Sequence, residues 1–422
     1  MRRISSRKTL AVVASTAVAA LGLAACGSSG STQSSSGTIT IGVMEPLSGG
    51  FSGPGESAVN AVKMAVADIN SAGGIKSLGG KKLSVVSVDS TTDDPTKATA
   101  AANDLAQDHP AFVVGPFVSA VSLPASTVFE RAHIPECVGS FSDDLTNRGY
   151  KYLFELPPTA TQLGDAAVKA LAQVVPVVAP GADKVAAIYD SNPGEAVVSA
   201  FAKSVQQSSS LKVVLNEQFP SGLTNAAPLA QKIKSSGAQV LVPGATTPEL
   251  ELILGALSSL GQGNIPIFNP GGGAPATTDY VKGLKNLVNG QFVLPTWDYD
   301  MKLSPAQNQL LSKINTEFTS KYKQPFMGQF AGEDYVCTQA LATAMNTAKS
   351  SDPTKIRDAM SGATFTSGPA SLMPPGRVHF NENGLNDAAT TLVSEWCDGK
   401  LTTVSPKSLA ASPIKSPKEC GR

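Results

Sequence analysis

Serine hydroxyls that follow predicted strands are the clearest candidates for chemistry in this chain. Ser119 lies where the strand ending at Gly115 passes through a loop into a helix, and Ser140 and Ser142 lie in the loop after the next strand. The free amides and macrodipole of a helix N-terminus favour a carboxylate or another electron-rich oxygen. The hydroxyl and amide of Ser119 therefore predict an oxygen-binding site. A helix cap is the competing role for Ser119, and plain turns are the alternative for the other two serines.

Hydrolytic or metal-dependent chemistry has little support in the sequence. A serine hydrolase places its nucleophile in a G-x-S-x-G turn and uses a later histidine. Residues 50–55 read GFSGPG, so the last glycine is displaced by one position, and His109, His133 and His379 have contexts that suggest no positioned base. The five cysteines have no CxxC spacing, and the three histidines have no HExxH pattern. We therefore expect no catalytic residue, no metal site and no cofactor.

Charge and length narrow the class of protein. The 422 residues contain 33 Lys and Arg against 33 Asp and Glu. A nucleic-acid-binding protein normally carries a strongly basic domain or stripe, so this balance argues against nucleic acid as a partner. At about 100–200 residues per domain, the chain has room for two or three globular units.

The N-terminus has the pattern of an export signal. Basic residues between Arg2 and Lys8 precede an apolar stretch at 10–23, which is short for a spanning helix. The sequence Leu23-Ala24-Ala25-Cys26 resembles a bacterial lipobox, so we expect residues 1–25 to be a signal peptide and Cys26 to carry lipid. A plain secretory signal is the alternative. Residues 26–37 form the lipidated Cys and a Gly/Ser-rich flexible tether, and the mature chain has 29 basic and 33 acidic residues, a net charge of −4.

The mature chain alternates strands with helices, which predicts an α/β fold with parallel sheets. After Pro157-Pro158 the same rhythm begins again, so two successive α/β units are expected. The predicted strands are 39–44, 83–89, 112–115, 135–139, 185–189, 213–219, 240–242 and 267–268, with hairpin-like strands at 378–380 and 390–396. Apolar residues at 59, 62, 66 and 69 predict the first helix, and Asp94-Pro95 opens the second. The later predicted helices are 119–131, 161–175, 196–208, 226–235, 247–260, 305–322, 333–349 and 353–360.

Several ordered segments resemble the extracytoplasmic solute-binding proteins of the branched-chain amino-acid (Leu/Ile/Val-binding) ABC transporter family. Residues 39–49 read ITIGVMEPLSG, residues 67–75 read ADINSAGGI, and a D…DP stretch runs from Asp89 to Pro95. Val114-Gly115-Pro116 then precedes Ser119, and the match continues more weakly to Trp396. The order and spacing of these segments carry the resemblance over essentially the whole mature chain.

The resemblance implies the type I periplasmic binding protein fold. In that fold two Rossmann-like lobes, each a parallel sheet flanked by helices, enclose a ligand cleft and close on the ligand by hinge motion. Three hinge crossovers are expected near 157–161, 294–296 and 368–376. The first lobe then comprises 38–158 plus 296–370, the second 159–295 plus 371–405, and 406–422 form a C-terminal tail.

The ligand contacts implied by the resemblance gather at strand ends in both lobes. Ser119 and the residues around Ser140 and Phe141 match the positions that hold a carboxylate. The full set of expected contacts is Ser119, Ala120, Ser140, Phe141, Ser142, Thr246, Asn269, Glu45, Phe51 and Phe330. The alternatives are core packing for the phenylalanines, helix capping for Thr246 and a solvated strand end for Glu45.

One departure from the family pattern bears on the ligand. Amino-acid-binding members usually place an acidic residue in the second lobe to pair with the ligand ammonium, and residues 269–274 here read NPGGGA. Burying an unpaired ammonium is costly. An amide, a urea-like compound or an organic acid therefore fits at least as well as an amino acid, unless Glu45 supplies the missing charge.

Four cysteines remain once Cys26 is assigned to lipid, and they allow three pairings. We favour Cys397 with Cys420, which would pin the tail to the last strand. Cys137 with Cys337 then follows, and the resemblance places both in the first lobe. Free buried thiols are the alternative.

The function expected from these observations is non-catalytic capture of a small polar solute and its delivery to a membrane ABC permease. A membrane-anchored ligand sensor for a signalling receptor is the main alternative, and an exported α/β hydrolase is a weaker one. We expect a monomer held by its lipid anchor on the outer face of the bacterial cytoplasmic membrane.

Overall fold

The first sheet of the computed structural model consists of five parallel strands in the order β2-β1-β3-β4-β5. The structure describes residues 37–191, 194–208, 210–416 and 418–421. The predicted signal peptide, Cys26 and the tether up to residue 36 lie outside the described residues. The strands are β1 (Ile39–Glu45), β2 (Leu83–Asp89), β3 (Val113–Val114), β4 (Glu136–Val138) and β5 (Leu153–Glu155).

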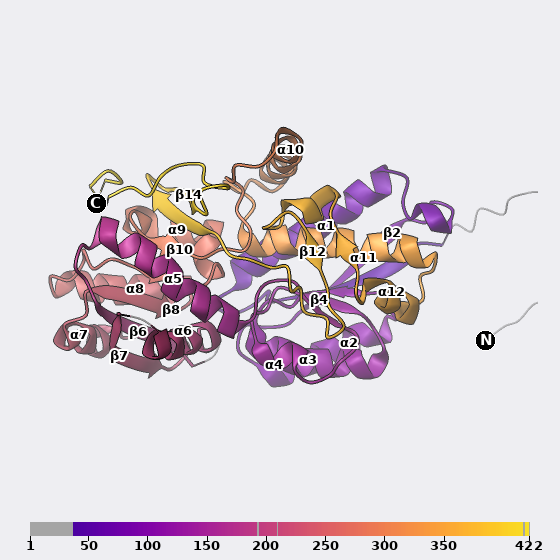
Figure 1. Ribbon diagram of the computed structural model, residues 1–422. Helices are drawn as coiled ribbons and strands as arrows, with labels where there is room; N and C mark the ends of the chain where they lie inside the picture. The colour runs from indigo at the N-terminus through magenta and orange to yellow at the C-terminus, as the bar shows by residue number, and fades with distance from the viewer. Residues whose placement is uncertain (1–36, 192–193, 209, 417, 422) are drawn as a thin grey trace, which may run out of the picture. The chain divides into compact units, whose positions relative to one another are not determined.

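Helices cover both faces of the first sheet. On one face α1 (Ser52–Ser71) and α11 (Gln329–Ala348) pack together, and on the other α2 (Pro95–Gln107) packs beside α3 (Ser119–Ala132) (Figure 1). Strands covered on two faces become continuously apolar rather than alternating. The interior strand β1 follows this burial pattern, because its residues are buried at every position except Thr40.

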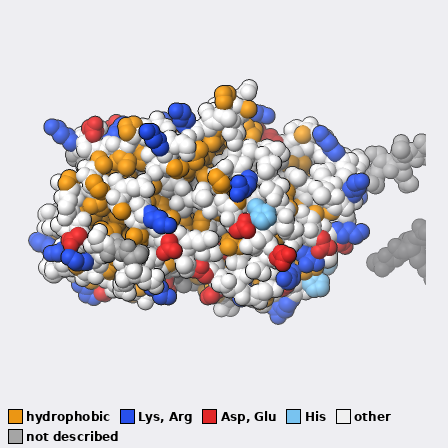
Figure 2. Space-filling model, in the orientation of Figure 1, with side chains coloured by type: hydrophobic (Ala, Val, Ile, Leu, Met, Phe, Trp, Pro, Cys, Tyr) orange, Lys and Arg blue, Asp and Glu red, His pale blue; other side chains and the backbone are white. Residues whose placement is uncertain are grey.

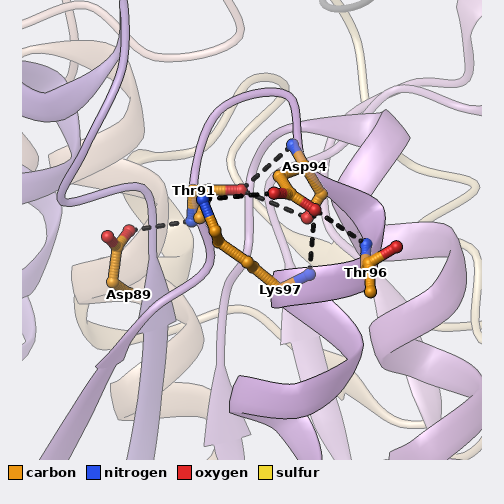
Figure 3. Close-up of polar contacts among 5 residues, drawn as sticks. All are labelled: Asp89, Thr91, Asp94, Thr96 and Lys97. Atoms are coloured by element: carbon orange, nitrogen blue, oxygen red, sulfur yellow. Dashed lines mark hydrogen bonds and ion pairs between the residues drawn. The ribbon is translucent and has the colours of Figure 1, made fainter.

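The D…DP stretch of the sequence forms a helix start. The Asp94 carboxylate accepts hydrogen bonds from the amides of Thr96 (3.1 Å) and Lys97 (3.0 Å), and Pro95 opens α2 (Figure 3). Asp89 accepts a 2.8 Å hydrogen bond from the Thr91 amide. These bonds occupy backbone donors that a helix and its preceding turn leave without partners. The stretch therefore has a structural role.

The second group of strands continues the βα rhythm and ends in a hairpin. Strands β7 (Lys212–Phe219), β6 (Lys184–Asp190) and β8 (Val240–Gly244) are parallel, and a bridge from Leu241 to Ile267 links them to β9 (Phe268–Asn269) and β10 (Phe292–Val293). The antiparallel strands β13 (Val393–Cys397) and β14 (Lys400–Ser405) complete this second sheet.

Helices also cover both faces of the second sheet. The helices α5 (Ala160–Val178) and α6 (Glu195–Ser208) share one apolar cluster with β6 and β8, and α7 (Ala227–Ser236), α8 (Thr247–Ser259) and α9 (Thr278–Leu284) share another. The α/β class expected from the sequence is therefore confirmed. The remaining elements are α4 (Asp143–Thr146), α10 (Pro305–Tyr322), α12 (Pro353–Met360), β11 (Thr364–Phe365), β12 (Val378–His379) and the short 3-10 turns η1 (Lys76–Leu78), η2 (Ala274–Ala276), η3 (Lys285–Val288) and η4 (Gly368–Leu372).

The C-terminal path differs from the sequence expectation. Residues 371–405 were expected in the second lobe after a crossing near 368–376. Instead, β12 pairs with β11, and the Asn386 amide donates to the Glu155 carbonyl beside the first sheet. Val378 and Phe380 are buried in the first sheet's core, which explains why the chain stays there. It joins the second sheet only at β13.

Two disulfides anchor separate regions. Cys137 of β4 is bonded to Cys337 of α11, and Cys397 of β13 is bonded to Cys420 of the tail. This is the pairing that the sequence analysis favoured. The first bond fastens α11 to the first sheet, and the second fastens the tail to the second sheet.

The surface shows no large field of one charge on the face drawn in Figure 2, where acidic and basic side chains are interspersed among the coloured residues. In the part of the chain that the structure describes, no helix is both long enough and apolar enough to cross a membrane.

Candidate ligand-binding site

A pocket of about 80 Å³ is lined by residues from the carboxyl ends of strands in both sheets. In parallel α/β sheets this edge is where ligands bind. The residues that come from the first sheet's loops and from α11 form what we call the first wall: Phe51, Phe117, Val118, Ser119, Phe141 and Phe330. The residues from the second sheet form the second wall: Gly194, Val197, Val198, Pro243, Gly244, Ala245, Asn269, Pro270, Gly271, Gly273, Ala274 and Pro275.

Aromatic rings build most of the first wall. The rings of Phe117 and Phe330 stack with centroids 3.6 Å apart and planes 7° apart. Phe51 meets both rings edge-on, at 5.8 Å and 6.3 Å. Each such pair contributes about 0.5–1.5 kcal/mol beyond the burial of its area. The three rings therefore form a rigid apolar surface.

Ser119 adds a polar group to this wall. It opens α3, whose first amides have no partner inside the helix. The Ser119 hydroxyl oxygen accepts a hydrogen bond from the Phe141 amide at 3.3 Å. Its own proton is then free to donate to a ligand oxygen. The same hydrogen bond joins two of the loops that line the pocket.

The structure does not bring four of the expected contacts to the pocket lining. The Ser140 hydroxyl contacts Ser122 Oγ at 2.5 Å and donates to the Pro116 carbonyl, and Ser142 is buried just before α4. Ala120 lies on α3 beside Ser119 but outside the lining. Thr246 forms the capping box of α8, with its amide and hydroxyl donating to Glu249. The Ser140 side chain is therefore used in packing between loops, and the Thr246 side chain caps a helix.

Glu45 does not line the pocket either, and its burial excludes the alternative of a solvated strand end. Glu45 is fully buried and accepts a 3.4 Å hydrogen bond from the Phe117 amide, behind the first wall. Burial raises the pKa of Glu45, and the neighbouring Asp334 raises that pKa further. Burial likewise raises the pKa of Glu333 and of Asp334 to about 8. Glu333 and Asp334 are therefore mainly neutral carboxylic acids near pH 7, and burial also favours the neutral form of Glu45.

The same buried acids connect α11 to the second wall. Glu333 accepts hydrogen bonds from the Thr296 hydroxyl and from the Gln329 side-chain amide, the latter at 3.0 Å. Gln329 in turn accepts a 3.3 Å hydrogen bond from the Thr296 amide. A Cβ on Gly272 would lie 1.5 Å from Gln329 Oε1, so only glycine allows the loop after β9 to pass so close. This contact sets the position of the loop that carries Asn269 and Gly271.

Asn269 is the polar side chain of the second wall. Its Nδ2 atom donates to the Phe292 carbonyl at 3.0 Å and to Gln291 Oε1 at 3.4 Å. Both amide protons are therefore used within the protein. Within the described part of the chain, nothing donates to Asn269 Oδ1, which leaves this acceptor for a ligand.

Close backbone contacts shape the rest of the second wall. A Cβ on Gly194 would lie 2.1 Å from the Gly244 carbonyl oxygen, so the loop before α6 passes directly over the end of β8. The Asp190 carboxylate accepts a 2.7 Å hydrogen bond from the Gly194 amide. Phe117, Val197 and Gly244 line the pocket without having been expected there from the sequence. Phe117 lies in the loop after β3, two residues before Ser119, and this position is a signal that could have found it.

The pocket lining is uncharged in the part of the chain that the structure describes. In the described residues that form both walls, none is Asp, Glu, Lys, Arg or His. No group of three or more His, Cys, Asp and Glu side chains is arranged to hold a metal ion in the described part of the chain.

Comparisons with known proteins identify the family. The model of the periplasmic binding protein family matches residues 38–394, and the chain belongs to this family. The Leu/Ile/Val-binding protein homolog 8 of Brucella melitensis biotype 1 is 28% identical over 391 residues, which cover 89% of this chain and 93% of the relative. The family places the protein on the extracytoplasmic side, and the resemblance stated from the sequence is confirmed.

Solved structures agree on the fold. The branched-chain amino-acid transporter substrate-binding protein LivJ of Streptococcus pneumoniae, in complex with isoleucine, superposes with a TM-score of 0.74 at 22% identity and covers 88% of this chain and 100% of its own. The leucine-binding protein LivK of Thermotoga maritima gives a TM-score of 0.71 at 19% identity, covering 87% and 98%. The chain therefore has the type I periplasmic binding protein fold.

Proposed function

We propose that this protein captures a small polar solute without chemical change and delivers it to an ABC uptake permease of the branched-chain amino-acid type. The observation that carries the proposal is the pocket, whose lining comes from strand ends of both sheets. Ser119 at the start of α3 supplies the oxygen-binding group, as the sequence predicts. The family and the named relatives support the same role.

The proposed ligand is an amino acid, an amide or urea-like compound, or an organic acid. The relative from Streptococcus pneumoniae holds isoleucine, and leucine is named for two other solved structures. An amino acid brings an ammonium group into the pocket. The second wall offers Asn269 there and no acid.

We further propose that the two sheets are the cores of two lobes that close on the ligand. Phe51, Ser119, Phe141 and Phe330 contact it from one lobe and Asn269 from the other. The N-terminal pattern supports export, removal of residues 1–25 and lipid attachment at Cys26, with a monomer as the working form.

A thermal-shift panel tests the proposal. The part of the chain from Ser36 to Arg422 forms one compact unit and serves as the sample. A ligand that binds only the folded state adds about 2.7 kcal/mol of stability at a hundredfold excess over Kd. We expect one class among amino acids, small amides, ureas and carboxylates to raise Tm.

Two variants make the panel specific to the pocket. Ser119→Ala should reduce the shift, whereas Ser259→Ala, an exposed serine on α8, should leave it unchanged. A shift that is equal in both variants would place the ligand elsewhere. Loss of uptake of the same compound in a deletion strain would separate transport from the sensor role.

A further inference from the structure

We infer that the pocket selects a neutral carboxamide with an apolar body over a zwitterionic amino acid. The inference rests on the proposed function and narrows the ligand class for the same site. Its support comes from three features of the walls: the absence of charge, the pairing of donors with an acceptor, and the aromatic surface.

The absence of charge holds for every described residue that lines the pocket. The described lining contains no ionisable side chain. Residues 192 and 193, which precede Gly194 and are not described, are Asn and Pro in the sequence, so neither supplies a charge. An ammonium group closed into this pocket therefore lacks a counter-ion, and burying such a group without one is costly.

Nearby acidic side chains are engaged with the backbone of the pocket loops. Glu45 accepts from the Phe117 amide behind the first wall, and Asp190 accepts from the Gly194 amide behind the second. Glu249 holds the amide and hydroxyl of Thr246 at the start of α8. Turning one of these acids toward a ligand ammonium would break the bonds that position its loop.

The polar groups that remain match the two ends of a carboxamide. The Ser119 hydroxyl and the first amides of α3 are donors, which suit a carbonyl oxygen. Across the pocket, Asn269 is 1% exposed and its Oδ1 atom is an acceptor without a partner in the described residues. An amide N–H₂ satisfies this acceptor, whereas a carboxylate would place two acceptors face to face.

The rest of the lining suits an apolar body. Phe51, Phe117 and Phe330 present ring surface from the first wall, and Val197 and Pro243 face them from the second. Because a water molecule needs about 10–15 Å³ of such space, the 80 Å³ pocket holds a molecule of roughly the size of five to eight waters. A branched or ring-bearing carboxamide of fewer than ten heavy atoms meets this limit.

A series of four compounds with one carbon skeleton tests the inference by calorimetry. L-leucine is a zwitterion, 4-methylpentanoate is the anion without the ammonium, L-leucinamide is the cation, and 4-methylpentanamide is neutral. We expect 4-methylpentanamide to bind to the Ser36–Arg422 unit at least about tenfold more tightly than L-leucine. The reason is that burying a polar group without a partner weakens the binding constant by a factor of about ten or more.

A gain of charge in the second wall provides the converse test. A Cβ on Gly271 would have only Val197 within 4 Å, at 3.7 Å, so a side chain fits there and extends beside a pocket residue. Gly271→Asp should improve L-leucine binding relative to 4-methylpentanamide. Gly271→Asn has nearly the same shape without the charge and should not.

The outcomes separate this inference from the proposed function. Tighter binding of L-leucine than of 4-methylpentanamide to the unmodified protein would overturn the inference while leaving solute capture intact. Tightest binding of the anion, or no binding of 4-methylpentanamide, would also overturn it. If no compound of the broader panel bound in a Ser119-dependent manner, the proposed function itself would fail.

Discussion

The two walls of the pocket are built by different physical means. The first wall consists of phenylalanine rings that pack on one another, held from behind by buried acids and by the bond between Cys137 and Cys337. The second wall consists largely of glycine, proline and small aliphatic residues, whose backbone approaches the neighbouring strands closely.

This contrast assigns different roles to the two walls. The first wall supplies apolar surface and the hydroxyl of Ser119, so it should determine affinity. In the described lining, the second wall supplies the side-chain acceptor of Asn269, and its small residues leave space. It should therefore determine which ligands are excluded. Damage to the first wall should therefore cost both stability and binding, whereas changes to the second should mainly alter selectivity.

The largest expected difference between the regions comes from their disulfides. Cys137 and Cys337 are 200 residues apart, and Cys397 and Cys420 are 23 apart. Loop-closure entropy predicts a loss of about 5 kcal/mol for Cys137→Ala with Cys337→Ala, and about 3 kcal/mol for Cys397→Ala with Cys420→Ala. Urea unfolding of both double variants measures the two losses. Equal losses would show that chain entropy does not govern the difference.

The second largest difference is expected in the unfolding free energy when one side chain of each wall is truncated. Phe330 is 3% exposed and stacks on Phe117, so Phe330→Ala should cost about 3–5 kcal/mol of unfolding free energy. Val197 is only partly buried, and Val197→Ala should cost about 1 kcal/mol or less. Chemical denaturation of both variants provides the comparison. A Phe330→Ala variant as stable as Val197→Ala would contradict the account of the first wall.

The buried acids predict a fall in stability as pH rises. The pKa values of Glu333 and Asp334 are raised to about 8, and unfolded carboxyls titrate near pH 4. Between these pH values the folded state binds more protons than the unfolded state. The contribution of the two acids to the free energy of unfolding is therefore full below about pH 4 and is lost as the pH approaches 8. The loss should amount to a few kcal/mol.

Substitution of single acids tests whether this pH dependence of stability comes from the region behind the first wall. Glu333→Gln should flatten the curve of unfolding free energy against pH up to about pH 8. Asp298→Asn is the matched control beside the second sheet, where burial raises the Asp298 pKa to about 6, so its effect should end near pH 6. Identical curves for Glu333→Gln and the unmodified protein would remove Glu333 from the explanation.

The smallest effect is expected at Ser119. Its hydroxyl is half-buried and makes one hydrogen bond to the Phe141 amide at 3.3 Å, so Ser119→Ala should change stability by less than about 1 kcal/mol. Loss of the hydroxyl as a ligand donor should weaken binding by about fivefold to tenfold. Thermal unfolding and calorimetry of one sample separate the two effects. A large loss of stability with unchanged affinity would assign Ser119 to the fold alone.

The sequence predicted the parts of the site that depend on local pattern. Ser119 and Asn269 each lie at or just after a strand end. The family resemblance added Phe51, Phe141 and Phe330 as expected contacts. All five line the pocket. Helix bounds such as Pro305–Tyr322 were also predictable, because a Ser cap and a Pro mark the start.

The structure departs from the sequence expectations where contacts join distant parts of the chain. Glu45 ends a strand, but its direction is set by α11, which packs there from almost 300 residues away and brings Glu333 and Asp334 beside it. The path of residues 378–386 follows from the burial of Val378 and Phe380 in the first sheet's core. Local pattern carries no information on either contact.

Simultaneous contact of one ligand with both walls is the central claim, and calorimetry on paired variants tests it most directly. The panel compound with the largest thermal shift is titrated into the unmodified protein, into Ser119→Ala from the first wall and into Val197→Trp from the second. We predict one site per chain, weaker binding in Ser119→Ala and none in Val197→Trp, because the larger ring fills the pocket. Unchanged affinity in either variant would contradict the claim.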